Sequence, residues 1–397
     1  MAGIAAVGFY LPRYAIAAEE YRRALGKFDA PAIREKSVPG FDEDEITMAV
    51  AAADRAIGAE PPAFLTYGSS SRTSAEGTVS EALGLESAAK REILGEPDAG
   101  VAALHAAVEF TAKDGGIALA IASDAPRAFA GSAAEHPLGG AAVACLVTAD
   151  GPVRRTEALG SGTASELLAR VGHVGAASPL LAFLDAMSRL SVGSRVSAGS
   201  LAFDLTAKPA GDLDLRSALD RRISLTYERY VRVRRYEPPP PGTEYSQGAY
   251  VSPSAYRAET KARYRLIGER CTTCGRLHFP PRESCLACGG RSWEDVPLRR
   301  TGTVYAYTII GSGAAPSEFL EQQLAVGEYA TAVVSLDDGP RVAAMLTDVE
   351  PADVKIGLPV RMVFRRIYAQ EGATRYGFKF APQMRPGEPL AFSPRIR

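Results

Sequence analysis

Several features are scarce in this chain of 397 residues. It holds five cysteines and none before Cys145, so its first third has no thiol nucleophile. Its formal net charge is −1, which argues against a nucleic-acid partner held by a broad basic face. No hydrophobic run reaches transmembrane length, and residues 1–12 lack the basic segment that opens an export signal. These absences favour a cytoplasmic protein with no membrane and no nucleic-acid partner.

The other four cysteines form two C-x-x-C pairs. Cys271 and Cys274 are followed, after ten intervening residues, by Cys285 and Cys288. This spacing lets four thiolates meet at one tetrahedral point and predicts a zinc ribbon. Two disulfides in an exported protein are the alternative, and His278 inside the motif is an alternative ligand. Because four thiolates leave no coordination position for substrate, such a Zn²⁺ ion is structural.

The segment before residue 236 has an α/β pattern. Short apolar runs alternate with amphipathic stretches, as in a layered sheet covered by helices. The predicted strands are residues 4–9, 64–67, 117–123, 141–148 and 195–202. One helix is predicted over residues 42–57, with four acids loading its first turn. Another is predicted over 178–190, with Ser178 as N-cap and Pro179 at the first helical position.

The pattern changes after the proline-rich segment 238–242, which can neither continue a helix nor pair inside a sheet. A charged helix is predicted over 252–267, leading into the ribbon. Short alternating runs follow and predict an antiparallel OB-like barrel; they are residues 303–310, 329–336, 341–346 and 360–365.

These patterns predict four parts of the chain. They are an α/β domain at 1–235, a Pro-rich linker at 236–251, a helix plus zinc ribbon at 252–300, and an OB-fold domain at 301–397. The length supports this division, because 397 residues exceed one ordinary hydrophobic core.

The C-terminal third resembles the acyl-CoA-associated family built from a helix, a rubredoxin-like zinc ribbon and an OB fold. The resemblance rests on residues 271–282, 285–289, 302–307 and 356–360. Members of that family accompany thiolase-like enzymes, so it implies a coenzyme A ester as ligand and a separate thiolase subunit as partner. The candidate residues for CoA phosphates are arginines, which can form forked hydrogen bonds: Arg276, Arg282, Arg291, Arg299 and Arg300.

The N-terminal segment resembles 3-hydroxy-3-methylglutaryl-CoA synthase and its relatives of the thiolase fold. The resemblance rests on residues 8–14, 36–49, 67–69, 172–179 and 223–230. It implies an α/β thiolase-like layered domain in front of the ribbon and barrel. It also implies self-association through this domain.

The catalytic residues of the synthase family are absent from the matching positions. Its cysteine falls at about Pro97, and its glutamate falls at Ser70. Its histidine belongs to the stretch that is reduced here to residues 149–171, which contains no histidine. We therefore predict a truncated, catalytically silent domain.

Other residues remain candidates, each with a simpler structural interpretation. His173 is a candidate base, although a histidine in a glycine-rich turn is the simpler interpretation. Cys145 is expected to be a buried small hydrophobe. The remaining expectations are a core or interface position for His105, a loop for His136, a solvated loop for Ser69 to Ser71 and a turn at 159–163.

Three functions are compatible with these features. The favoured prediction is a non-catalytic subunit that binds and tethers acyl-CoA in a thiolase-type complex making or cleaving C–C bonds in CoA esters. One alternative is a stand-alone synthase-like acyltransferase or aldolase that uses His173. The other is an acyl-CoA-binding scaffold with no associated reaction.

Overall fold

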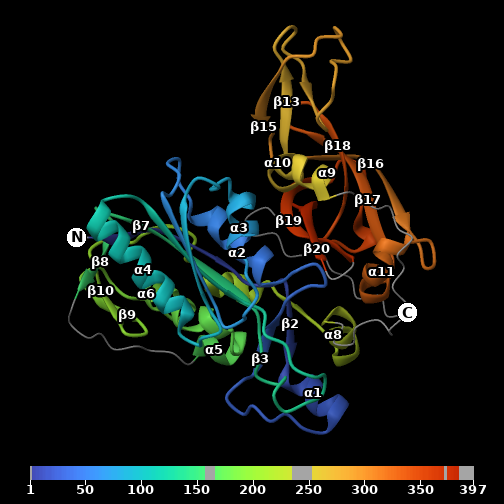
Figure 1. The fold of residues 1–397 in the computed structure, drawn as a ribbon. Coiled ribbons are helices and arrows are strands. Elements are labelled where there is room, and N and C mark those ends of the chain that lie inside the picture. The colour runs from blue at the N-terminus through green and yellow to red at the C-terminus, as the bar shows by residue number, and fades with distance from the viewer. Residues whose placement is uncertain (1, 157–165, 235–252, 371–372, 384–397) are drawn as a thin grey trace. The chain divides into compact units, whose positions relative to one another are not determined.

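The computed structural model describes residues 2–156, 166–234, 253–370 and 373–383 (Figure 1). The chain divides into two compact units, Met1–Pro238 and Pro239–Arg397. The predicted linker at 236–251 and the predicted turn at 159–163 lie outside the described residues. Within the described ranges, no helix is long and apolar enough to cross a membrane.

The first unit is built on a nine-stranded mixed sheet. Its order is β5-β4-β6-β7-β1-β8-β10-β9, with β11 beside β1. Strands β6 and β7 are almost wholly buried, which explains their continuous apolar sequences. The strands are β1 (Gly3–Tyr10), β4 (Phe64–Ser69), β5 (Ala89–Leu94), β6 (Ala118–Asp124), β7 (Ala141–Thr148), β8 (Val153–Thr156), β9 (Arg195–Ala198), β10 (Leu201–Leu205) and β11 (Ala210–Gly211).

Helices cover both faces of this sheet. Helix α2 (Glu45–Ala56) packs on β1 and β7, and α4 (Ala99–Asp114) packs on β4 and β6. Two glycines allow these close approaches: a Cβ on Gly8 would lie 2.2 Å from the Ala52 carbonyl, and one on Gly68 would lie 2.3 Å from that of Ala99. The other helices are α1 (Ala18–Leu25), α3 (Glu76–Leu83), α5 (Glu166–Val171), α6 (Ser178–Arg189), α7 (Leu215–Asp220) and α8 (Tyr227–Arg234).

A small second sheet joins distant parts of the same unit. Its order is β12-β2-β3, from strands β2 (Tyr14–Ala17), β3 (Glu35–Val38) and β12 (Ile223–Ser224). Beside it, Ile16, Tyr21, Val38, Leu225 and Tyr230 form a hydrophobic cluster.

Three predicted elements differ in detail. The strand predicted at 195–202 is a hairpin of β9 and β10 that turns at Gly199, where φ is 57°. Helix α2 starts at Glu45, and Asp44 is its N-cap, accepting from Thr47 N at 2.9 Å. The preceding Glu43 is buried instead of loading the first turn, because it accepts bonds from the Tyr10 hydroxyl and Gly40 N.

Helix α6 also starts differently from the prediction. Ser178 is its first residue and not its N-cap. The Ser178 hydroxyl instead accepts from Val174 N at 3.1 Å, across the short 3₁₀ turn Gly175–Ala177.

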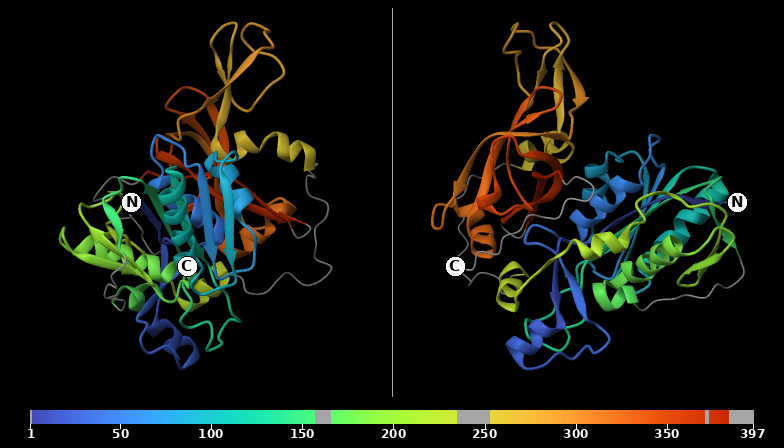
Figure 2. Two further views of the ribbon diagram at one scale, coloured as in Figure 1. Left: turned by 60° about the vertical axis from the view of Figure 1, so that its left-hand side comes forward. Right: turned by 180° about the vertical axis from the view of Figure 1, so that it is seen from behind.

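The second unit combines helices, a ribbon and a barrel. The predicted helix at 252–267 is two short helices, α9 (Pro253–Ala258) and α10 (Thr260–Arg265), divided at Glu259. The ribbon sheet has the order β14-β13-β15, from β13 (Ile267–Cys271), β14 (Leu277–His278) and β15 (Trp293–Pro297). Both views in Figure 2 show the ribbon, in gold, extending from one end of the barrel.

The barrel has the strand order β18-β17-β16-β19-β20. Its elements are β16 (Thr301–Ile310), α11 (Leu320–Val326), β17 (Tyr329–Leu336), β18 (Arg341–Met345), β19 (Pro359–Gln370) and β20 (Ala373–Pro382). Strand β20 was not predicted, and β19 is longer than the predicted run. Val304, Val334, Val360 and Phe380 fill the interior. The predicted fold class, a layered α/β unit followed by a ribbon and an antiparallel barrel, is confirmed.

Candidate metal centre and ligand cavity

The two C-x-x-C segments form matching turns at the tip of the ribbon. In the first, Gly275 N donates to the Cys271 carbonyl at 2.8 Å, and in the second Gly289 N donates to that of Cys285 at 2.8 Å. Gly275 and Gly289 have φ values of 74° and 71°. Only glycine adopts this left-handed conformation without strain, so each glycine lets its chain fold back and present two thiols.

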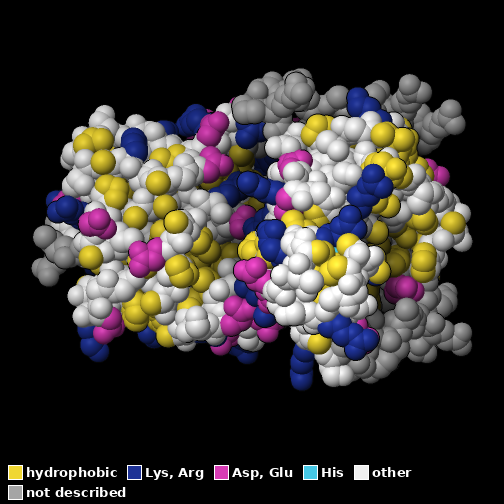
Figure 3. Space-filling model, turned by 90° about the horizontal axis from the view of Figure 1, so that it is seen from above, with side chains coloured by type: hydrophobic (Ala, Val, Ile, Leu, Met, Phe, Trp, Pro, Cys, Tyr) yellow, Lys and Arg dark blue, Asp and Glu magenta, His cyan; other side chains and the backbone are white. Residues whose placement is uncertain are grey.

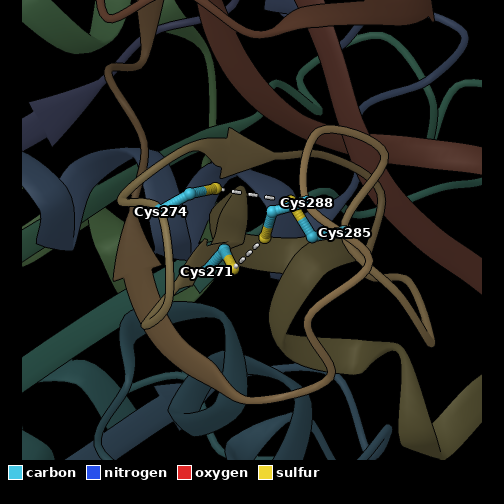
Figure 4. Close-up of side chains that lie close together, drawn as sticks. All are labelled: Cys271, Cys274, Cys285 and Cys288. Atoms are coloured by element: carbon cyan, nitrogen blue, oxygen red, sulfur yellow. Dashed lines mark hydrogen bonds between the residues drawn. The ribbon is translucent and has the colours of Figure 1, made fainter.

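The four thiols converge on one point (Figure 4). Cys271 Sγ lies 3.6 Å from Cys288 Sγ, and Cys274 Sγ lies 3.6 Å from Cys285 Sγ. All four sulfurs lie within 4.8 Å of one another. A tetrahedral ion with Zn–S bonds of about 2.3 Å requires S···S separations of about 3.8 Å, so these residues fit a structural zinc ion. The two-disulfide alternative does not fit, because all four cysteines are free.

Hydrogen bonds around the sulfurs favour the ionised thiol at Cys271 and Cys285 but not at Cys288, where neighbouring thiols raise the pKa. Burial opposes ionisation of Cys271, but hydrogen bonds from the backbone of Cys274 and Thr273 bring its pKa down to about 6. His278 Nε2 lies 3.3 Å from Cys285 Sγ, and its ring is buried edge-on against Trp293. His278 is therefore a hydrogen-bonding neighbour of a ligand and not one of the four converging groups.

A cavity of about 310 Å³ lies elsewhere in the second unit. Its walls come from α10, from residues 279–281 after the ribbon's short strand, and from β18, β19 and β20. The walls are largely apolar, with Arg263 and Glu259 as the charged members. Arg263 Nη2 donates to Glu259 Oε2 at 2.9 Å. A concave apolar site with a few polar groups is the usual form of a small-molecule site.

None of the arginines predicted to bind CoA phosphates lines this cavity. Their side chains are exposed, on the ribbon for Arg276, Arg282 and Arg291 and at the start of the barrel for Arg299 and Arg300. Figure 3 shows Lys and Arg interspersed with acidic and apolar side chains on one face of the molecule. The structure thus gives these five positions no common site.

The first unit holds the residues that the resemblance placed at synthase catalytic positions and the other candidate residues. Pro97 lies just before α4, whose N-cap is Asp98. Cys145 is fully buried in β7, and burial raises the pKa of its thiol to about 12, as expected for a small core residue. His173 is exposed, and its backbone pairs with the segment around Leu138. For His105 a core or interface position was expected; the core position is wrong, because its side chain is 47% exposed on α4, and the interface position stays a prediction.

The serines predicted to lie in a solvated loop belong in part to a buried hydrogen-bonded centre. Asp124, at the end of β6, is 1% exposed. Its carboxylate accepts from Ser69 Oγ at 2.5 Å, from Ser70 N at 3.0 Å and from Ala176 N at 2.5 Å. The expectation is therefore wrong for Ser69, which is fully buried. Through these hydrogen bonds Asp124 connects the ends of β4 and β6 to the Gly175–Ala177 turn.

A second buried polar cluster was missed from the sequence. Lys36 is 1% exposed, and its Nζ donates to the Glu135 carbonyl at 2.7 Å and to the Tyr230 hydroxyl at 3.1 Å. The Glu135 carboxylate lies 3.8 Å from Nζ and accepts from the Tyr21 hydroxyl at 2.8 Å. Burial lowers the pKa of Lys36 to about 7, against the opposing effect of Glu135.

His136, the residue after Glu135, belongs to the same buried region. It is fully buried, and its Nδ1 accepts from Asp29 N at 2.8 Å. No sequence pattern brings these residues together, because they come from α1, β3, α8 and the loop before β7. Because these side chains are buried, we interpret their role as stabilising the fold of the first unit.

The ribbon and barrel together define a class, the zinc-ribbon/OB-fold proteins, and comparisons with known proteins agree. Residues 259–294 match the family model described as ChsH2, rubredoxin-like zinc ribbon domain. Residues 295–365 match that described as ChsH2, C-terminal OB-fold domain.

A DUF35 domain-containing scaffold protein of Methanocaldococcus jannaschii is 39% identical over 125 residues, which cover 31% of this chain and 84% of that protein. This chain therefore belongs to the family of DUF35 domain-containing scaffold proteins through its C-terminal part. The benzoylsuccinyl-CoA thiolase subunit BbsA of Thauera aromatica is 33% identical over 89 residues, covering 22% of this chain and 56% of that protein.

Synthase relatives are also found. A hydroxymethylglutaryl-CoA synthase of Methanococcus vannielii is 54% identical over 61 residues, which cover 14% of this chain and 17% of that protein. A crystal structure of HMG-CoA synthase complexed with CoA aligns with 58% of this chain and 90% of its own, with 15% identity and a TM-score of 0.49.

Proposed function

We propose that this chain is a non-catalytic scaffold subunit that associates with a separate thiolase-type enzyme acting on CoA esters. The observation that carries the proposal is the ribbon and barrel unit, which shares 39% identity with a scaffold protein over 84% of that protein's length. A relative named as a thiolase subunit supports the same kind of partner. In this role the chain binds the enzyme and the CoA ester and leaves the chemistry to the partner's nucleophile.

The first unit supports a non-catalytic role. Covalent acyl transfer through a cysteine needs an accessible, ionisable thiol, and the thiol of Cys145 is fully buried with its pKa raised to about 12. By the resemblance, the synthase cysteine falls at about Pro97 and the synthase glutamate at Ser70, and neither residue can take over its role. We infer that this unit retains the synthase fold for association, with itself or with the partner.

Zinc has a structural part in this proposal. Cys271, Cys274, Cys285 and Cys288 would hold one Zn²⁺ ion, with no position left for substrate. Four reduced thiols require a reducing compartment, which favours the cytoplasm.

The test is reconstitution with a thiolase-type enzyme from the same organism. The two purified proteins should form a stable complex on size-exclusion chromatography with light scattering. Turnover of a CoA ester should require the partner's cysteine and survive Cys145→Ala in this chain. Turnover by this chain alone, or failure of the two proteins to associate, would contradict the proposal.

A further inference from the structure

A polar pocket of about 420 Å³ lies in the first unit, between β3 and α5. Helix α5 packs against β3 there (Figure 1). The residues that line the pocket are Ala17, Arg34, Glu35, Glu166 and Arg170. All but Ala17 are charged, so this pocket suits an ionic ligand, in contrast to the largely apolar cavity of the second unit.

The half-buried part of the pocket is neutralised by short hydrogen bonds. Arg170 Nε donates to Glu35 Oε1 at 2.7 Å, and its Nη1 donates to Asp220 Oδ1 at 2.8 Å. The buried Arg222 also donates to Glu35 Oε1, from Nη2 at 2.6 Å. The carboxylates of Glu35 and Asp220 are therefore engaged by Arg170 and Arg222.

The exposed part of the pocket is bonded far more weakly. Arg34 Nη2 lies 3.9 Å from Glu166 Oε1, and Arg216 Nη2, on α7, lies 3.9 Å from Glu166 Oε2. Both separations exceed the limit of about 3.2 Å for an N–H···O hydrogen bond. Among the described residues, Arg34 and Arg216 form no other ion pair. Two exposed guanidiniums thus share one exposed carboxylate.

The ion pairs around the pocket leave an excess of positive charge. They join four arginines, Arg34, Arg170, Arg216 and Arg222, to three acids, Glu35, Glu166 and Asp220. Exposed ion pairs at such distances contribute little to stability, so a ligand can displace the Glu166 carboxylate at small cost. The group that replaces it must be an anion able to bond two guanidiniums at once.

A phosphate group meets this requirement better than the carboxylate it would replace. A phosphate monoester carries a charge of about −1.5 to −2 at pH 7 and three strong acceptor oxygens. Arginine guanidiniums form short, charge-assisted and often bidentate hydrogen bonds with such oxygens. The volume of about 420 Å³ also leaves room for a small organic group beside the phosphate.

We propose that this pocket binds the phosphate group of a small phosphorylated molecule. Arg34 and Arg216 hold the phosphate, and Glu166 is the internal anion that the ligand displaces. The site belongs to the first unit and does not depend on the CoA-ester function proposed above.

The experiment is a ³¹P NMR titration of inorganic phosphate with the full zinc-loaded chain, at pH 8 and about 0.1 M ionic strength. Arg34→Gln and Arg216→Gln should each raise the dissociation constant by about tenfold, because each removes one charge-assisted contact. Glu166→Gln should lower the dissociation constant by about threefold, because no carboxylate then competes with the phosphate. All three side chains are exposed, so the variants should fold like the unmodified chain.

Two matched controls make the same changes of charge outside the pocket. Arg195→Gln alters an exposed arginine on β9, and Glu109→Gln alters an exposed glutamate on α4. Each should leave the dissociation constant within about twofold, because charges beyond about 10 Å are screened at this ionic strength.

Three results would each overturn the assignment. They are no binding of phosphate by the unmodified chain, equal weakening in Arg34→Gln and Arg195→Gln, and binding by Glu166→Gln that is no tighter than binding by Glu109→Gln.

Discussion

The two units build their polar centres from very different stretches of sequence. In the C-terminal unit, the four converging thiols include Cys271 and Cys288, only 17 positions apart. In the N-terminal unit, Asp124 bonds Ser69 across 55 positions, and Lys36 bonds Tyr230 across 194. A local centre can assemble with its own short segment and a metal ion. A dispersed centre forms only when the whole unit has folded, so its contribution to stability is cooperative with the fold.

The largest effect expected from this contrast is loss of the ribbon when one thiol is removed. Cys271→Ser should reduce bound zinc from one ion per chain to near zero, because apparent zinc-binding free energies of about 10–16 kcal/mol are folding free energy in such segments. Zinc per chain, measured by atomic absorption, provides the test. Cys145→Ala is the control and should retain its zinc, and equal zinc in both variants would contradict a four-thiolate site.

The buried cluster around Lys36 should make the stability of the N-terminal unit depend on pH. Lys36 has a pKa of about 7 in the folded protein against 10.5 in the unfolded chain, so between these values the unfolded chain binds the extra proton. The free energy of unfolding of the N-terminal unit should therefore rise with pH in this window, by up to about 1.4 kcal/mol per pH unit.

Urea unfolding at several pH values in that window measures this slope. Lys36→Met should remove it, whereas Lys90→Met, on the exposed side of β5, should leave it unchanged. An identical slope in Lys36→Met would show that Lys36 is not its source.

Removing the charge of the other dispersed centre should have an intermediate effect. Asp124→Asn keeps the shape but removes the charge that accepts from Ser70 N and Ala176 N, and it places an amide NH2 where the carboxylate accepts from Ser69 Oγ. The expected cost is about 3 kcal/mol in unfolding free energy. The matched control is Asp150→Asn, at an exposed aspartate, for which a change within about 0.5 kcal/mol is expected. The denaturant midpoints of the two variants measure this difference in stability. Equal midpoints would argue against a central role for Asp124.

The smallest expected effect is on zinc affinity, from removal of His278 beside the metal site. His278→Ala should leave one zinc ion bound but lower its affinity by about 10- to 100-fold, because the Cys285 sulfur loses a hydrogen bond. Competition with a chromogenic chelator measures the affinity, with His105→Ala on α4 as control. Complete loss of zinc would instead make His278 a ligand, and unchanged affinity would make its contact with Cys285 incidental.

Local patterns explain most of what the sequence predicted. The C-x-x-C spacing predicted the convergence of the thiols because short turns with glycine leave few alternative geometries. The apolar runs predicted β4, β6 and β7 because both faces of these strands are buried. The run at 195–202 was misread because Gly199 reverses the chain within it. Strand β20 was missed because its burial depends on pairing with β19 rather than on its own pattern.

The sequence by itself determined the ribbon, the α/β pattern of the first unit and the antiparallel pattern of the barrel, because each of these depends on neighbours along the chain. Only the tertiary structure decided that Asp124 and Lys36 lie in buried polar clusters, that the His105 side chain is exposed, and that α10, β18, β19 and β20 line a cavity. These features arise from segments brought together by packing, and burial and hydrogen bonding between such segments leave no periodic signal in the sequence.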